Sequence, residues 1–293
     1  MPMKRSFLLL PSLMIVFHLS WGQTSLPDPL LDNIAFHADV MVNAVMDRHR
    51  IKAHDIFLTA MDSMLARPGS YNISLDSIPW LSVVHGDSFR IVTWQLRLSD
   101  SEYKYGGFIQ WPDRIVELKD TRPWLNGSSY STYTPGAWYG CLYYKIIPFE
   151  SEGKKYYVLF GFNAENESVN TKVADILDLT GTEPRFGVSL FEGKDQVRTR
   201  LILTYGDVSS VQLIFDPALK AIVHDHLESL PGVGPSGEAL IVSDGSLEGW
   251  FLKHGKWVYE EKVYDVKMDE PPMLDERKNH KEDKDIFGRP KKN

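Results

Sequence analysis

The sequence predicts a mainly β protein with an N-terminal helical segment. From about Trp138 to Tyr264, short apolar segments alternate with turn signals, which is typical of an antiparallel meander whose strands pair in sequence order. Aromatic residues make up 12% of the chain, and their large flat side chains suit a pleated surface. Strands paired in this way can close as a barrel, pack as a sandwich or form propeller-like blades, and the periodicity does not choose among these.

Composition places the chain among soluble globular proteins. It has 293 residues, 43% hydrophobic and 24% charged, which is enough to bury a substantial core. The formal net charge is −7 at pH 7. Because nucleic-acid binding needs a basic face, the sequence indicates no nucleic-acid partner.

The first 22 residues have the layout of a secretory signal peptide. Lys4 and Arg5 precede an apolar run from Phe7 to Leu19, and the small residues around Gly22 follow it. An uncleaved anchor is the alternative, but the run is shorter than the roughly 20 residues that span a bilayer. We therefore expect a periplasmic or secreted protein with no transmembrane anchor after cleavage.

Residues 23–70 read as a linker followed by helix. Leu26–Leu31 holds two prolines, and Asp32 or Asn33 can then cap a helix. Apolar residues recur at close to helical spacing up to Leu65, and Arg67-Pro68-Gly69 ends the segment. One long helix and two short ones both fit this pattern.

Residues 71–266 form the predicted β-rich domain. Phe89–Leu98 alternates as a strand, and strands continue around Gly106-Gly107. The Ser-, Gly-, Pro- and Thr-rich stretch Asp120–Pro135 reads as an internal loop. The charged residues 267–293 cannot build a core and are predicted to be a disordered tail.

Turn pairs divide the meander into hairpins. Asp244-Gly245 is the strongest two-residue hairpin signal, because both residues tolerate the positive φ of a type I′ turn. His254-Gly255 is a weaker copy. Glu150–Gly153 and Asn163–Asn166 are further candidate loops, and Asp216-Pro217 is a turn pair.

The single cysteine, Cys141, rules out an intramolecular disulfide. Its setting, WYGCLYY, is that of a buried strand face, where cysteine behaves as a small hydrophobic residue. We expect a structural role for it rather than a nucleophilic one.

His224-Asp225-His226 is the sharpest chemical constellation. On a strand, alternate side chains share a face, so the two imidazoles project together and can hold one metal ion. A divalent metal is the one cofactor that the sequence suggests. A third ligand would come from across the sheet, and the candidates are Asp207, Asp244 and Glu248. The alternative is that the histidines lie on a solvated sheet face or bond to neighbouring loops.

A cluster of tryptophans provides a second candidate site. Trp111, Trp124 and Trp138 lie around the long loop, and exposed aromatic rings on a β platform can stack on the apolar faces of sugars. Such clusters are more often core, because aromatic rings are the largest apolar groups available. A glycan is the ligand that this site would take.

Several segments resemble a group of exported proteins of Bacteroidota-type bacteria that carries no assigned activity. The likeness covers roughly Phe89 to Tyr264 and consists of aromatic and turn patterns: WYGCLYYKII, YYVLFGFNAEN, RFGVSLFE, SVQLIFD, IVHDHLE and SDGSLEGWFLKHGKWVY. The resemblance implies a periplasmic or secreted location and transfers no site residues.

The function that the sequence favours is a non-catalytic binding or structural role in the cell envelope, with an envelope protein or a glycan as partner. The rival is an exported hydrolase, metal-assisted through His224 and His226. No Gly-x-Ser-x-Gly elbow, His-Glu-x-x-His helix or phosphate-binding loop appears in the sequence to name a reaction.

Overall fold

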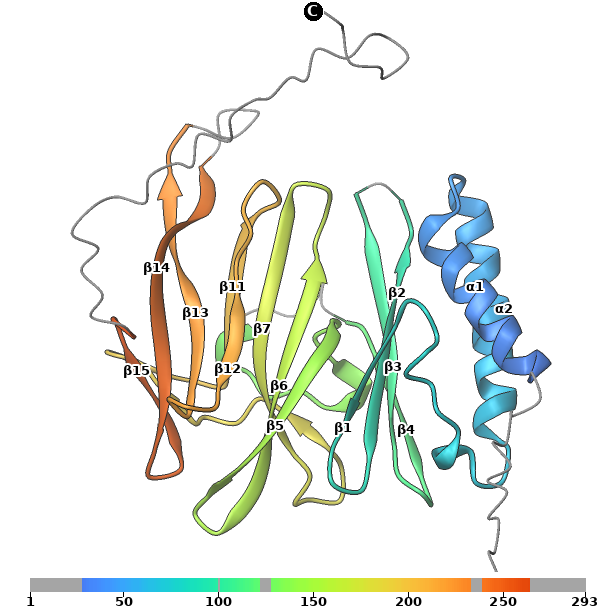
Figure 1. The fold of residues 1–293 in the computed structure, drawn as a ribbon, viewed down its shortest axis with the longest axis horizontal. Coiled ribbons are helices and arrows are strands. Elements are labelled where there is room, and N and C mark those ends of the chain that lie inside the picture. Colours follow the sequence, from blue (N-terminus) through green and yellow to red (C-terminus); the bar gives the residue numbers. More distant parts are fainter. Residues whose placement is uncertain (1–27, 100, 122–127, 233–238, 264–293) are drawn as a thin grey trace, which may run out of the picture.

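The computed structural model describes residues 28–99, 101–121, 128–232 and 239–263. Within these residues the chain forms two α-helices, three short 3-10 helices (Ser70–Asn72, Ser128–Tyr130 and Pro135–Ala137) and three stacked β-sheets (Figure 1). The signal peptide predicted for residues 1–22 and the tail predicted for 267–293 lie outside the described residues, as does Trp124.

Each sheet is built mainly from consecutive strands. The first sheet has the order β1 (Leu81–His85), β2 (Arg90–Arg97), β3 (Tyr103–Gln110), β4 (Ile115–Lys119). The second has the order β11 (Arg200–Gly206), β7 (Val169–Asp178), β6 (Lys154–Ala164), β5 (Leu142–Ser151), with β8 (Arg185–Phe186) paired to β7. The third has the order β10 (Val197–Arg198), β9 (Phe191–Glu192), β15 (Lys256–Glu260), β14 (Leu240–Lys253), β13 (Ala221–Leu230), β12 (Leu213–Asp216).

The predicted antiparallel meander is confirmed within each sheet, and the β15–β9 pair is parallel. The strands of the described residues close no barrel; the three sheets stack face to face instead.

Three hydrophobic clusters fill the spaces between the four layers. One joins the helices to the first sheet, one joins the first sheet to the second, and one joins the second to the third. Neighbouring residues of β2 show how a strand serves two clusters, since Ile91 belongs to the middle cluster and Val92 to the helical one. A sheet buried on both faces explains why FRIVTWQLRL is apolar on both sides.

The N-terminal segment forms two helices, α1 (Pro29–Asn43) and α2 (Asp47–Leu65). The first begins earlier than predicted, because Asp28 accepts a hydrogen bond from the Leu30 N–H at 3.0 Å and Pro29 stands at the first helical position, where its missing N–H costs nothing. Buried Arg50 donates to the carbonyls of Ala44 and Val45 in the break between the helices. The predicted stop is confirmed, since α2 ends just before Arg67-Pro68-Gly69.

The prediction that Asp244-Gly245 is a stronger hairpin signal than His254-Gly255 was wrong. Lys253 pairs with Lys256, so the two-residue turn is His254-Gly255, with φ of 50° and 80°. Asp244-Gly245 lies inside β14, where pairing with β13 resumes at Leu247. Gly245 keeps its positive φ of 86°, yet it serves a bulge instead of a turn.

Other turn predictions match the structure. Glu152-Gly153 connects β5 to β6 with both φ values positive. Asp216 closes the turn between β12 and β13 by accepting hydrogen bonds from the Ala218 and Leu219 N–H groups. The interpretation of Cys141 as a buried structural residue is confirmed as to its position, because the side chain is 0% exposed.

Candidate functional site

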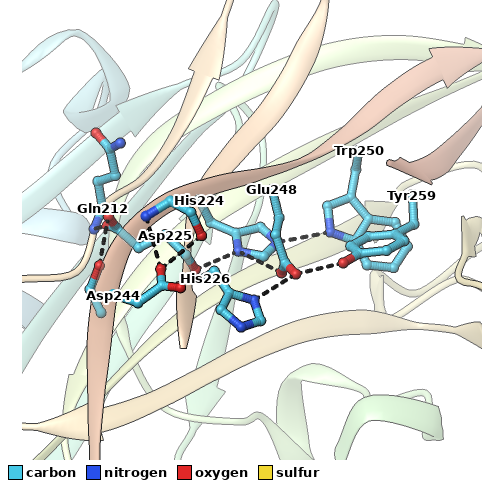
Figure 2. A network of polar contacts seen from close by, with 10 residues as sticks. Gln212, His224, Asp225, His226, Asp244, Glu248, Trp250 and Tyr259 are labelled. Atoms are coloured by element: carbon cyan, nitrogen blue, oxygen red, sulfur yellow. Dashed lines mark hydrogen bonds and ion pairs between the residues drawn. The ribbon is translucent and has the colours of Figure 1, made fainter. Parts of the chain in front are cut away.

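The candidate site lies on the third sheet where β13, β14 and β15 run side by side. His224 is on β13, Glu248 and Trp250 are on β14, and Tyr259 is on β15. His224 lies directly opposite Glu248, and Trp250 lies directly opposite Tyr259. Glu248 and Trp250 are two residues apart on β14, so the two pairs share one face of the sheet and their side chains form a diagonal row across the three strands (Figure 2).

A bulge shapes the edge of this row. The register between β13 and β14 shifts between Asp225 and Leu227, so His226 faces the irregular stretch around Gly245. Asp225 secures the region, since it accepts hydrogen bonds from the Gln212 N–H and, at 3.1 Å, from Ser243 Oγ. The carboxylate thus ties the segment before β12 to β14 and has a structural task.

His224 uses both of its ring nitrogens within the protein. Nδ1 is 2.9 Å from the Asp225 carbonyl oxygen, and Nε2 is 3.1 Å from Trp250 Nε1. Because the indole N–H can only donate, Nε2 must accept and Nδ1 must carry the proton. Burial lowers the pKa of this imidazole, which is 4% exposed, so His224 is neutral at pH 7.

Glu248 links His226 and Tyr259 through one oxygen. Oε1 is 2.8 Å from His226 Nδ1 and accepts from the Tyr259 hydroxyl at 2.6 Å. The hydrogen bond to Glu248 raises the pKa of His226. Burial, followed by the bond to Glu248, raises the pKa of Tyr259, which keeps this hydroxyl a donor. The second carboxylate oxygen, Oε2, lies 3.8 Å from His224 Nδ1, beyond hydrogen-bond distance.

A cavity of about 480 Å³ opens beside this row, between the second and third sheets. Its walls are Gly193–Gln196 and Arg198 of the hairpin between β9 and β10, the start of β11, and His224, Glu248, Trp250 and Tyr259. Lys194 lies over the Tyr259 ring at 5.6 Å and bonds Glu261 at 2.6 Å.

Arg198 is the unusual residue of the cavity wall. Its Nε is buried and has no hydrogen-bond partner within the described residues. A buried guanidinium nitrogen without a partner loses the free energy of its hydration, so a cavity beside it offers room for an acceptor.

The structure brings both predicted metal-binding histidines to Glu248, one of the three carboxylates proposed as a third ligand. Asp244 lies near His226, yet its Oδ1 accepts from the N–H and Oγ of Ser246. In the described ranges no group of three or more His, Cys, Asp or Glu residues has the geometry to hold a metal ion. With both nitrogens of His224 already engaged, that ring presents no lone pair to an ion in this arrangement.

The tryptophan platform is not assembled as expected. Trp138 is 0% exposed, and its indole N–H donates to Tyr143 at 2.9 Å in the middle cluster. Trp111 is half-buried beneath the guanidinium of Arg114, 4.1 Å from the ring centroid. The prediction of exposure was wrong for Trp138, because a ring of this size fills the space between two sheets better than any other side chain.

Sequence reasoning missed Arg198, Trp250 and Tyr259. Trp250 and Tyr259 flank the His254-Gly255 turn, so recognising that turn as the hairpin would have paired them across β14 and β15. Arg198 carries no such signal, because the burial of one nitrogen depends on how the sheets pack.

Among the described residues, no helix is both long enough and apolar enough to cross a membrane. No known family model, curated protein or solved structure matches this chain.

Proposed function

We propose that the protein is a non-catalytic binding protein of the bacterial cell envelope that holds a small acidic saccharide in the cavity between its second and third sheets. The unpartnered Nε of Arg198 in the cavity wall is the observation that carries the proposal. The envelope location rests on the predicted signal peptide, and the glycan partner follows the expectation drawn from the sequence.

A carboxylate suits the side of the cavity that the β9–β10 hairpin forms. Arg198 and Lys194 line it together with one acidic residue, Asp195, and a hydrogen bond between a guanidinium and a carboxylate is among the stronger ones in proteins. Lys194 already pairs with Glu261, so Arg198 is the group that gains most from an anionic ligand.

Hydroxyl groups suit the opposite side. Glu248 accepts through Oε1 from His226 and Tyr259, and no described residue donates a hydrogen bond to Oε2. A sugar hydroxyl can donate to that oxygen while the Tyr259 ring provides apolar contact. A ligand with both a carboxylate and hydroxyls fits the two sides together, and uronic acids have this chemistry.

The absence of catalysis in this proposal follows from the hydrogen bonds. His224 has both nitrogens engaged, and the hydrogen bond to Glu248 raises the pKa of His226, which favours its charged form. Such groups orient one another and give a ligand a fixed surface, while none of them is left as a neutral base facing the cavity.

Calorimetric titration with glucuronate and galacturonate oligosaccharides tests the proposal, with neutral oligosaccharides of the same length beside them. Arg198→Gln should weaken the affinity for acidic oligosaccharides by about tenfold or more and leave the affinity for neutral ones unchanged, because the lost hydrogen bond is charge-assisted. Arg114→Gln removes an exposed arginine outside this cavity and is the matched control.

Binding of neutral sugars alone would contradict the acidic ligand, and binding unchanged in Arg198→Gln would contradict the site. Near-ultraviolet circular dichroism of each variant shows whether the fold is retained.

The rival function, a metal-assisted hydrolase, is favoured by one observation. His226 Nδ1 and His224 Nδ1 lie 2.8 and 3.8 Å from oxygens of Glu248, so two imidazoles and a carboxylate converge. Metal binding there would require the bond between His224 and Trp250 or Asp225 to break. Elemental analysis of untagged protein decides: about one transition-metal ion per chain, lost on changing both histidines to Ala, would favour the hydrolase.

A further inference from the structure

A second cavity, of about 400 Å³, lies between α2 and the β3–β4 side of the first sheet. It is separate in its residues from the cavity beside Glu248, since the two share none. Its wall is largely apolar and includes Leu58, Met61, Leu65, Phe108, Ile115 and Leu118.

Glycine in β3 makes room for one aromatic side of the cavity wall. Gly106 and Gly107 stand together in β3, and Gly106 lies directly opposite Trp94 on β2. The Trp94 indole covers Gly106 so closely that a Cβ at this position would be 2.7 Å from Nε1. The glycine therefore allows a large ring to lie flat on the sheet and form part of the cavity wall.

The Trp94 ring carries an unmatched donor. The side chain is 6% exposed, and Nε1 is buried with no hydrogen-bond partner in the part of the chain that the structure describes. Phe57 and Phe108 pack around the ring at centroid distances of 5.2 and 6.2 Å and offer no acceptor. A buried indole N–H usually finds a partner, so an acceptor on a ligand would satisfy a donor that no described residue satisfies.

The rim of the cavity carries charges of both signs. Lys104 and Lys119 line it together with Asp62, Glu117 and Asp120, and Lys119 Nζ lies 3.6 Å from Glu117. His54 also lines the cavity, and burial lowers the pKa of its imidazole, which leaves it uncharged at neutral pH. A ligand with a strong net charge of either sign gains little from such a rim.

From these observations we infer that the cavity between α2 and β3–β4 binds a neutral, largely apolar small molecule that carries a hydrogen-bond acceptor. The apolar wall takes the body of the ligand, and the Trp94 indole N–H donates to the acceptor. This site is independent of the saccharide site, because its residues, its polarity and the chemistry of its ligand all differ.

Nile red is a suitable probe, because it is neutral, apolar and carries a carbonyl acceptor. The experiment titrates the full chain and follows the rise in fluorescence of the dye. Ile115→Lys places a charge at the cavity wall, and Ile214→Lys places the same charge on another edge strand outside the cavity. The two isoleucines are a matched pair, with exposed fractions of 41% and 43%.

We expect Ile115→Lys to weaken the affinity for the dye about tenfold or more and Ile214→Lys to leave it unchanged. Only the charge at position 115 must lose its hydration when the dye binds. Trp94→Phe keeps a ring over Gly106 and removes the donor, so it should weaken the dye by about fivefold to tenfold. Arg198→Gln should have no effect, which separates this site from the saccharide site.

Equal affinity in Ile115→Lys and Ile214→Lys would overturn the site. Unchanged affinity in Trp94→Phe would overturn the role of the indole N–H. Tighter binding of the anionic dye anilinonaphthalene sulfonate than of Nile red would overturn the inference that the ligand is neutral. Ile115→Lys and Trp94→Phe act on different elements, so a folding defect in one leaves the other to decide.

Discussion

Arg200 Nη2 lies 3.1 and 3.0 Å from the two carboxylate oxygens of Asp175, and both side chains are 0% exposed. The pair joins neighbouring strands β11 and β7 within the second sheet. Burial raises the pKa of the Asp175 carboxyl, and the guanidinium opposes that rise. Arg200 Cζ lies 4.4 Å from the centroid of the Tyr133 ring, which shields the guanidinium charge from water.

Removal of one partner should therefore destabilise the fold strongly. Arg200→Met leaves a carboxylate buried without its cation, and we expect a loss of about 3–5 kcal/mol in the free energy of unfolding. Urea denaturation at pH 7 measures it.

The double variant Asp175→Leu with Arg200→Met separates the ion pair from packing. Because no buried charge remains, it should recover most of that loss. A double variant no more stable than Arg200→Met would show that the pair itself, rather than the orphaned charge, stabilises the sheet.

Cys141 should be unreactive in the native protein. Its thiol is buried, and burial raises the pKa, so the nucleophilic thiolate is suppressed. Its Sγ also lies 2.6 Å from where a Cβ on Gly161 would stand, which leaves no room for a reagent. Labelling by iodoacetamide should be slower than in guanidinium by about three orders of magnitude or more, since it requires unfolding. Similar rates in the two conditions would refute the buried assignment.

The sequence predicts the elements of this fold better than their arrangement. Alternation and turn residues are local, so the strands, the helix stop at Arg67-Pro68-Gly69 and the Glu152-Gly153 hairpin follow from them. Stacking into three sheets depends on contacts between distant segments, such as Ile91 with the cluster that includes Leu159. Local patterns hold no such information, and the choice among barrel, sandwich and propeller stayed open for that reason.

The reversed hairpin ranking shows a related limit. Asp-Gly and His-Gly both reach positive φ, so the dipeptides alone cannot tell a turn from a bulge. What distinguishes them is whether the residues after the glycine pair with the same neighbouring strand as the residues before it. They do so after Gly245, where Leu247 of β14 pairs with Asp225 of β13.

Two glycine variants measure this difference. Gly245 and Gly255 have φ of 86° and 80°, so alanine meets a similar backbone cost of about 1 kcal/mol at each. A Cβ at Gly245 has nothing within 4 Å, whereas one at Gly255 would be 2.8 Å from Ser151 Cα. Gly255→Ala should therefore lose about 1–3 kcal/mol more than Gly245→Ala in thermal or urea unfolding. Equal losses would mean that the contact with Ser151 relaxes freely.

The candidate site was partly visible in the sequence. Strand alternation singled out His224 and His226, and Glu248, which lies opposite His224, was one of three carboxylates that the sequence left open as a partner. The partners that define their chemistry, Trp250 and Tyr259, depend on the third strand of the row. The sequence therefore located the residues and left their protonation, which is the basis of the last prediction, to the structure.

His224 and His226 should give stability a maximum near the ordinary histidine pKa of 6.5. The pKa of His226 is raised by Glu248, so its stabilising effect is complete below 6.5 and is lost as the pH rises through the folded value. The pKa of His224 is lowered by burial, so its contribution is present above 6.5 and is lost as the pH falls through the folded value. The two effects therefore act on opposite sides of 6.5.

Urea unfolding from about pH 5 to about pH 8 tests this, because histidine is the side chain that titrates there. His226→Gln should flatten the decline on the alkaline side, and His224→Gln should flatten the decline on the acid side. Exposed His49 lies on α2, and His49→Gln is the control for a general effect of replacing a histidine. If His226→Gln instead altered only the acid side, Glu248 would not be holding a proton on His226, and the electrostatic basis of the site would be wrong.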